Sequence, residues 1–151
     1  MDAIRYGEDK ALLLPPEALR ILADSIYLPT PQRLTGRIQA WFDDPLVRVF
    51  FCVQESGVNG LLILRQMDGS AEILSIAVTP ERRRRGIGRC LIETASQALK
   101  TPVILAETDV EAVEFYRRAG FSIRSLGEKY PGAERFACRY SAVHHDRGGR
   151  I

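Results

Sequence analysis

The chain has 151 residues, of which 46% are hydrophobic and 26% are charged, and these proportions are typical of one soluble globular domain with a substantial core. The net charge of +2 is too small to indicate nucleic acid or a membrane as a partner. No apolar run reaches transmembrane length and the N-terminus does not resemble a signal peptide, so we expect a cytoplasmic protein.

In the first third of the chain, Pro15-Pro16-Glu17 opens a helical pattern that reaches Ile26 and is interrupted at Leu28-Pro29. Thr30 is a candidate N-cap for a second helix that extends to about Phe42. Strands are then predicted over residues 47–54, 60–67 and 70–78, with a turn at Glu55-Ser56-Gly57 and a hairpin turn at Asp68-Gly69.

The second half alternates between helical and extended patterns. We predict helices over 86–100 and 110–119, and strands over 102–107, 121–126 and 134–140. This order indicates a mixed α/β sheet within one domain, residues 1–140. The polar, Gly-rich tail, residues 141–151, is predicted to be mobile.

Nothing in the pattern of ligand-type residues favours a metal site. Cys52, Cys90 and Cys138 are an odd set without metal-like spacing, and we interpret them as buried thiols in a reducing compartment. The pair His144-His145 stands alone in the tail. We therefore expect no metal.

The most informative segment is Val78-Thr79-Pro80-Glu81-Arg82-Arg83-Arg84-Arg85-Gly86-Ile87-Gly88-Arg89, which joins a buried strand to a helix. Glycines at a helix start let backbone N–H groups approach a ligand, and the helix N-terminus adds partial positive charge. With the adjacent arginines, this combination predicts a pocket for a bulky polyanion such as a pyrophosphate.

Several polyanion sites are excluded by the spacing. A P-loop needs Lys and Ser or Thr after its last glycine, and here Arg89 follows Gly88. A dinucleotide fingerprint needs a third glycine where Leu91 stands. A nucleic-acid site would want aromatic residues among the basic ones, and there are none between residues 79 and 90.

The segment resembles the coenzyme A loop of the GNAT superfamily of N-acetyltransferases, Arg/Gln-x-x-Gly-x-Gly/Ala, which Arg83-Arg84-Arg85-Gly86-Ile87-Gly88 fits. A second stretch, Asp109 to Phe121, resembles the family's Asn-x-x-Ala-x-x-Phe-Tyr-x-x-x-Gly-Phe. Asp109 replaces the usual Asn, so a helix-capping oxygen is kept and an amide donor is lost. The resemblance covers roughly residues 46–140 and implies a single-domain α+β fold with a mixed, mostly antiparallel sheet flanked by helices.

The resemblance implies that acetyl-coenzyme A is the co-substrate and that the acetyl group passes directly to a primary amine in a ternary complex. It implies that the backbone of Ile76, Ala77 and Val78 pairs with the pantetheine arm, as an added strand would, and that the N–H of Ala77 or Val78 stabilises the oxyanion. The remaining expected coenzyme-binding residues are Arg83, Arg84, Arg85, Gly86, Ile87, Gly88, Arg89, Asp109, Ala112, Phe115 and Tyr116.

Two residues are the candidates for catalysis. Tyr116 occupies the position of the tyrosine that faces the coenzyme sulfur in the family, so it is the candidate general acid; packing in the core is its alternative role. Glu72 lies six residues before Val78 and matches a catalytic glutamate of the protein-lysine-acetylating branch. It is the candidate base, and a plain surface charge is its alternative role. Glu107, Asp109 and water are the other candidates for the base.

The acceptor amine is not identified by the sequence, and both a small molecule and a peptide or protein amine stay open. We expect it to contact Tyr27 between the first helices, and Glu128 and Tyr130 in the last hairpin. A homodimer and the use of longer acyl groups are also open. The alternative function is a non-catalytic sensor of acyl-coenzyme A; a membrane or nucleic-acid partner is not expected.

Overall fold

The computed structural model of the protein describes residues 4–13, 22, 31–55, 57–79, 86–128 and 130–141. The first predicted helix lies outside this part of the chain, apart from Leu22, which is helical and buried. The predicted tail, after its first residue, Ser141, also lies outside it.

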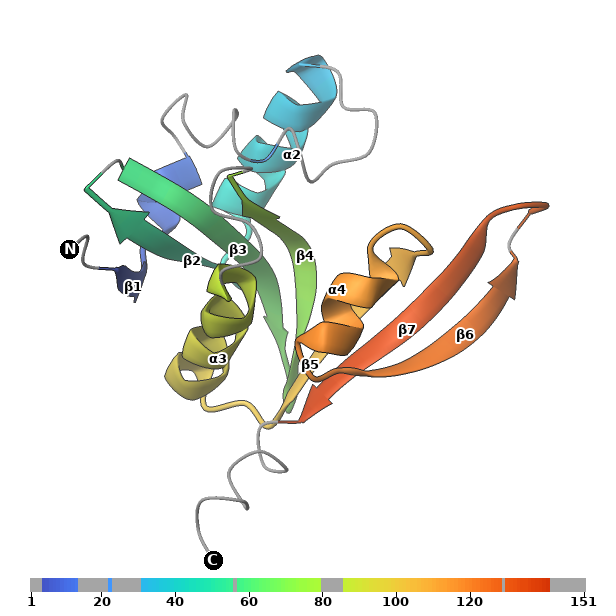
Figure 1. Ribbon diagram of the computed structural model, residues 1–151. Helices are drawn as coiled ribbons and strands as arrows, with labels where there is room; N and C mark the ends of the chain where they lie inside the picture. The colour runs from blue at the N-terminus through green and yellow to red at the C-terminus, as the bar shows by residue number, and fades with distance from the viewer. Residues whose placement is uncertain are drawn as a thin grey trace, which may run out of the picture.

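Seven strands form one sheet in the order β1-β2-β3-β4-β5-β7-β6 (Figure 1). Only β4 and β5 run parallel, so the prediction of a mixed, mostly antiparallel sheet is confirmed. The strands are β1 (Arg5–Glu8), β2 (Val47–Gln54), β3 (Gly57–Met67), β4 (Ser70–Val78), β5 (Val103–Asp109), β6 (Ser122–Glu128) and β7 (Glu134–Ser141).

The helical elements of the described residues are the short 3-10 helix η1 (Lys10–Leu13), α2 (Pro31–Asp43), α3 (Ile87–Leu99) and α4 (Val113–Arg118). In α3 the buried positions Ile87, Leu91, Ala95 and Leu99 recur every four residues, which explains why this segment is helical and packs on the sheet. The helix ends at Lys100, which adopts a left-handed conformation at φ 54°.

Several predicted boundaries were wrong. Strand β3 begins at Gly57 rather than Gly60, because Gly57 already pairs with Gln54 across the hairpin. Helix α4 is shorter than the predicted 110–119, since residues 110–112 form a turn that the Asp109 carboxylate stabilises. Strand β1 was not predicted: four partly exposed residues at a sheet edge leave little hydrophobic pattern.

The two faces of the sheet bury different cores. The front face, marked by Ile73, Ile76 and Ile104, packs against α3 and α4. The back face, marked by Ile63 and Ala77, packs against Ile38 and Trp41 of α2. Leu74 forms a β-bulge in β4 and is out of register with β3. Because of this extra residue, the hydrophobic side chains directly before and after the bulge region point to the same face of the sheet.

The sheet is split between β4 and β5. These strands share only two register pairs, Ala71 with Ile104 and Glu72 with Leu105, and then diverge toward their C-terminal ends (Figure 1). The backbone edge of β4 beyond Glu72 therefore has no neighbouring strand on that side within the described part of the chain.

Candidate active site

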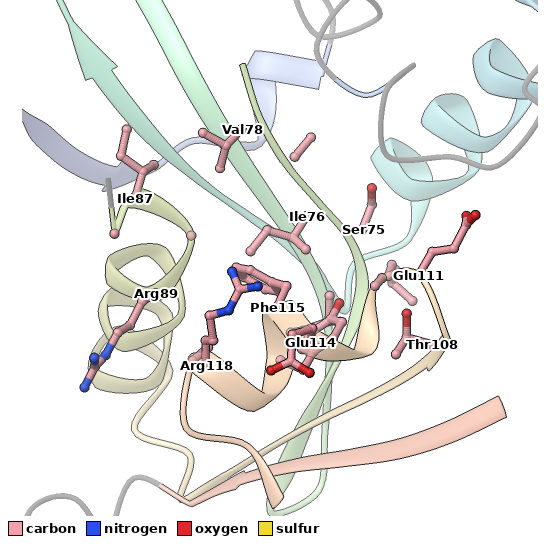
Figure 2. Close-up of a pocket in the computed structure, with 18 of the residues that line it drawn as sticks. Ser75, Ile76, Val78, Ile87, Arg89, Thr108, Glu111, Glu114, Phe115 and Arg118 are labelled. Atoms are coloured by element: carbon pink, nitrogen blue, oxygen red, sulfur yellow. The ribbon is translucent and has the colours of Figure 1, made fainter. Parts of the chain in front are cut away.

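A pocket with a volume of about 930 Å³ lies in the gap between β4 and β5. This volume is at the upper end of the range for small-molecule sites. Four elements contribute to it, as Figure 2 shows: β4, the start of α3, the end of β5 and α4. The lining residues are Ile73, Leu74, Ser75, Ile76, Ala77, Val78, Gly86, Ile87, Gly88, Arg89, Glu107, Thr108, Glu111, Ala112, Glu114, Phe115, Tyr116, Arg118 and Ala119.

The pocket passes through the thickness of the sheet. Six consecutive residues of β4, Ile73 to Val78, line it, and their side chains belong to both the front and the back faces. Since these residues face opposite sides of the sheet, a pocket that contacts all of them lies along the open edge of the strand. The backbone of Ile76, Ala77 and Val78 thus lines the gap, where an extended ligand can pair with it.

The N-terminus of α3 faces the same pocket. Gly86 takes a left-handed conformation, with φ 79°, and the first helical residues Ile87 and Gly88 are buried. The first turn of a helix carries N–H groups without intrahelical acceptors and a partial positive charge, a combination that attracts anions. Arg89 adds an exposed guanidinium, 3.6 Å from the Glu93 carboxylate. Arg83, Arg84 and Arg85 lie outside the described residues.

Gly88 and Phe115 are in close contact. A Cβ atom at Gly88 would lie 2.7 Å from Cε1 and 2.8 Å from Cζ of the Phe115 ring. The second glycine of the loop is therefore needed for α3 to approach α4. At Gly86, by contrast, a Cβ atom would meet nothing within 4 Å, and the positive φ is what favours glycine there.

Tyr116 lines the pocket and also belongs to the front core. Its position is therefore compatible with both predicted roles, general acid and packing residue. Its ring makes edge contacts with Phe115 and Phe121, at centroid distances of 5.1 and 5.2 Å. Burial raises the pKa of the Tyr116 phenol well above its ordinary value, and the Cys138 thiol raises it further. The phenol is neutral at pH 7 with or without this shift, and the shift makes it a weaker acid than an ordinary tyrosine.

Three carboxylates were candidate bases, and the structure separates them. Glu107 lines the pocket, and its Oε2 accepts a hydrogen bond from Arg135 Nε at 3.0 Å. Glu72 is half-buried at the closed end of the gap, beside Arg65 and Leu105 on the back face, and is not among the lining residues. Glu72 and Glu107 nevertheless share that face, since Leu105 and Glu107 are two residues apart on β5.

Asp109 has a structural contact instead. Its Oδ1 accepts hydrogen bonds from the backbone N–H groups of Glu111 at 3.0 Å and Ala112 at 3.1 Å. These bonds stabilise the turn at residues 110–112. The prediction that Asp109 caps the helix itself was wrong, because α4 begins at Val113 and its N-cap is Ala112. Ala112 reaches the pocket, whereas Asp109 is not among the lining residues.

The predicted acceptor contacts are not brought together at the pocket. Glu128 ends β6 opposite Glu134, and Tyr130 is 69% exposed in the loop that follows; neither lines the pocket. Tyr27 lies outside the described residues.

Several pocket residues were missed from the sequence, among them Thr108, Glu111, Glu114 and Arg118. A signal was available for Arg118, which lies three residues after Phe115 and so on the same side of α4. Ser75 had no signal, because only the divergence of β4 from β5 exposes its strand edge.

No three His, Cys, Asp or Glu side chains within the described ranges are grouped as metal ligands would be. No helix in the part of the chain that the structure describes is long and apolar enough to cross a membrane.

Comparison with known proteins places this geometry in a family. Residues 45–123 match the family model described as an acetyltransferase (GNAT) domain. No curated protein matches the chain.

Solved structures show the same fold at low sequence identity. A protein described as a GNAT-family acetyltransferase from Desulfovibrio desulfuricans is 23% identical, with 92% of this chain and 99% of that chain covered and a TM-score of 0.71. The ribosomal-protein-S18-alanine N-acetyltransferase of Escherichia coli is 20% identical, with coverage of 93% and 94% and a TM-score of 0.68. A GNAT-family acetyltransferase from Elizabethkingia anophelis with acetyl-CoA bound is 15% identical, with coverage of 91% and 97% and a TM-score of 0.67.

Proposed function

Because the chain belongs to the GNAT family of acetyltransferases, we propose that it moves the acetyl group of acetyl-coenzyme A to a primary amine by direct transfer. The observation that carries the proposal is the open edge of β4, which lines one pocket together with the start of α3 and the Tyr116 phenol.

The pocket supplies a suitable place for each part of the co-substrate. The N-terminus of α3 and Arg89 suit the pyrophosphate, because both attract anions. The open edge of β4 suits the pantetheine arm, whose amides can pair with a strand. A structure with acetyl-CoA bound among the fold's neighbours supports this assignment.

Two groups of the protein then serve proton transfer. Tyr116 is a neutral phenol that lines the pocket, and we assign it the protonation of the departing thiolate. An amine near pKa 10 is almost wholly protonated at pH 7, so a base must remove a proton before attack. Glu107 and Glu72 share the back face and are the candidates, with Glu107 the nearer to the pocket.

The oxyanion formed by attack on the thioester needs nearby donors. Backbone N–H groups on the open edge of β4, from Ala77 or Val78, are the donors that we propose. Their positions are fixed on the other edge, where Ala77 pairs with Leu61 and Val78 with Gly60 of β3. A donor held in this way costs little reorganisation during the reaction.

The test begins with binding. Acetyl-coenzyme A at 100 times its Kd should stabilise the protein by about 2.7 kcal/mol, which raises the melting temperature by about 5–10 °C for a domain of this size. NADH and ATP should have a much smaller effect. An equal shift with NADH would show that the pocket is not a coenzyme A site.

The second step is release of coenzyme A thiol upon addition of amines, measured with a thiol reagent. Release that depends on both the amine and the protein supports transfer. Stabilisation by acetyl-coenzyme A without release by any amine would instead support the alternative function, a sensor of acyl-coenzyme A.

A further inference from the structure

The two mouths of the pocket differ in chemistry. Tyr116 and the start of α3 are on the front side, where the coenzyme is proposed to bind. Ser75 and Glu107 are on the back face, because they lie in register with Ile63 and Ala137. If the coenzyme occupies the front side, the acceptor must reach the gap from the back face.

On this face, acidic and basic residues come from different strands. On β4 and β5 the ionisable residues that point to the back face are acidic: Glu72, Glu107 and Asp109. On β7 and β6 they are the arginines 135, 139 and 124. From β4 to β6 the face therefore carries acidic residues beside the gap and arginines on the far side, with Arg135 directly opposite Asp109 and with Arg65 of β3 opposite Glu72.

In two rows of the sheet an apolar side chain lies between the acidic residue and the arginine. Leu105 lies between Glu72 and Arg139 in the cross-strand register, and Ala137 lies between Glu107 and Arg124. Both apolar side chains are only partly buried. Strands two apart in a sheet are about 10 Å apart, so this is the approximate separation of the acidic and basic positions.

The charged groups are accessible to a ligand. Arg124 and Arg139 are exposed. The side chains of Glu107 and Arg135 are 41% and 33% exposed, although they pair with each other at 3.0 Å. Such partly exposed ion pairs are weak and can exchange partners with a charged ligand.

We propose that the acceptor is a primary amine that carries an anionic group at the far end of a short apolar spacer, such as an ω-amino acid. The ammonium lies beside Glu107 and Glu72, the spacer crosses Leu105 and Ala137, and the anion reaches Arg124 and Arg139. A diamine is disfavoured, because its second ammonium would lie beside the arginines. This inference rests on the proposed function and specifies its acceptor.

Three acceptors of matched length test it: 6-aminohexanoate, hexylamine and 1,6-diaminohexane, each assayed for coenzyme A release. We expect kcat/KM to be highest for 6-aminohexanoate and at least tenfold lower for the diamine, with the difference shrinking as salt rises, since exposed charges are screened. An acidic peptide with a free N-terminus in a further arm distinguishes a polypeptide source of the anion from a free amino acid.

The double variant Arg124→Gln/Arg139→Gln should lower kcat/KM for 6-aminohexanoate about 3- to 10-fold, mainly through KM, because two exposed charge contacts are removed. It should leave hexylamine unaffected. Arg5→Gln, in the edge strand β1, is the matched control and should change neither. Thermal stabilisation by acetyl-coenzyme A verifies that each variant is folded.

If kcat/KM for hexylamine or the diamine equalled that for 6-aminohexanoate, the acceptor assignment would be overturned. The proposal of acetyl transfer would be unaffected by that result. Equal losses with all three acceptors in the double variant would also overturn it. Absence of release with any amine would count against the proposed function itself.

Discussion

Tyr116 packs in the hydrophobic core and also lines the pocket. Its ring packs between Phe115 and Phe121, while its position on α4 brings it to the wall of the pocket. The contacts with Phe115 and Phe121 hold the ring in place, and the phenol is neutral at pH 7. A rigid, neutral hydroxyl beside a leaving thiolate is what general acid catalysis requires.

Tyr116→Phe should therefore separate the two roles. The ring contacts remain, so stability and coenzyme affinity should change little, while kcat should fall about 10²-fold or more. Steady-state rates of thiol release measure the loss. Tyr140→Phe is the matched control, because Tyr140 is equally buried in the same aromatic row, 5.4 Å from Phe121, and does not line the pocket. Equal rates for wild type and Tyr116→Phe, with chemistry limiting, would leave Tyr116 a packing residue.

The base can be assigned by comparing Glu72→Gln with Glu107→Gln. The residue that accepts the amine proton should, when changed, lower kcat/KM on the acidic limb of the pH profile, with recovery as the free amine becomes abundant near its own pKa. We expect Glu72→Gln to show this pattern if a water molecule connects it to the gap, since its side chain is not among the lining groups.

The pH profile also distinguishes the alternatives. A loss that is uniform across pH in Glu72→Gln would mean that the carboxylate only attracts the cationic substrate. A normal profile for Glu72→Gln together with an acidic-limb loss for Glu107→Gln would transfer the role to Glu107, which is the closer of the two to the pocket.

At the scale of elements, the contact between α3 and α4 depends on Gly88. Gly88→Ala should displace the Phe115 ring, which lies 2.7 Å from the new Cβ position, and overpacking of this kind costs about 1–3 kcal/mol. Because the ring also lines the pocket, coenzyme affinity should fall together with stability. Urea unfolding and calorimetric titration with coenzyme A measure the two effects.

Two other glycines serve as comparisons for Gly88→Ala. Gly86→Ala meets no atom within 4 Å, so its cost comes from the left-handed backbone, about 1–2 kcal/mol. Gly36→Ala in α2 also has open space and should stabilise the protein, by up to about 1 kcal/mol. If Gly88→Ala were as well tolerated as Gly36→Ala, the α3–α4 contact would not hold as described.

Asp44 stabilises the connection between α2 and β2. The Leu46 N–H donates to the carboxylate at 2.9 Å, and Arg65 Nε donates to it at 3.1 Å. These contacts, the backbone donor foremost, outweigh desolvation and hold the pKa of the Asp44 carboxyl below its ordinary value. A lowered pKa stabilises the folded protein above the ordinary pKa of an aspartate and loses that contribution as pH falls through the folded value.

Asp44→Asn should therefore reduce the melting temperature at pH 7, and the difference from wild type should disappear as the pH falls through the folded pKa of the Asp44 carboxyl, since both side chains are then neutral. Scanning calorimetry between pH 2.5 and 7 measures this. Asp43→Asn is the control, because the Asp43 carboxylate contacts Gln39 of its own helix. A constant difference at every pH would point to shape rather than charge.

For the whole molecule, prediction succeeded where the pattern is local. The prediction placed strand β4, the glycine-rich start of α3 and the Phe-Tyr pair of α4 correctly. The structure brings residues of all three into one pocket. The contact of the Asp109 carboxylate with the backbone two and three residues later was predictable in kind, although the helix begins only at Val113.

The remainder depends on contacts between distant segments. The back-face neighbours of Glu107 and Leu105 come from β7, about thirty residues later, and their pairing follows from register that no local pattern fixes. The same applies to Glu128 and Tyr130, which were expected at the acceptor site and lie instead toward the turn of the β6–β7 hairpin.

The split sheet predicts a distinctive pattern of hydrogen exchange. Acetyl-coenzyme A should slow exchange of those β4 amides that face the gap, since a bound pantetheine arm would lie along that edge and accept hydrogen bonds from it. Amides of β3, which is paired on both sides, should slow only as far as global stability increases. Mass spectrometry on peptides from the two strands compares them. Equal slowing in β3 and β4 would contradict strand-like pairing of the coenzyme.

The edge of β4 beyond Glu72, beside which no strand of the described residues lies, has a further consequence for behaviour in concentrated solution. Free strand edges with apolar side chains recruit strands from other molecules and cause aggregation. The segment Ile73-Leu74-Ser75-Ile76-Ala77-Val78 has no charge, proline or glycine to oppose this. Most proteins protect such edges with residues of their own, whereas here the protecting group would be the co-substrate. The supply of acetyl-coenzyme A would then govern not only turnover but how long the enzyme stays dispersed.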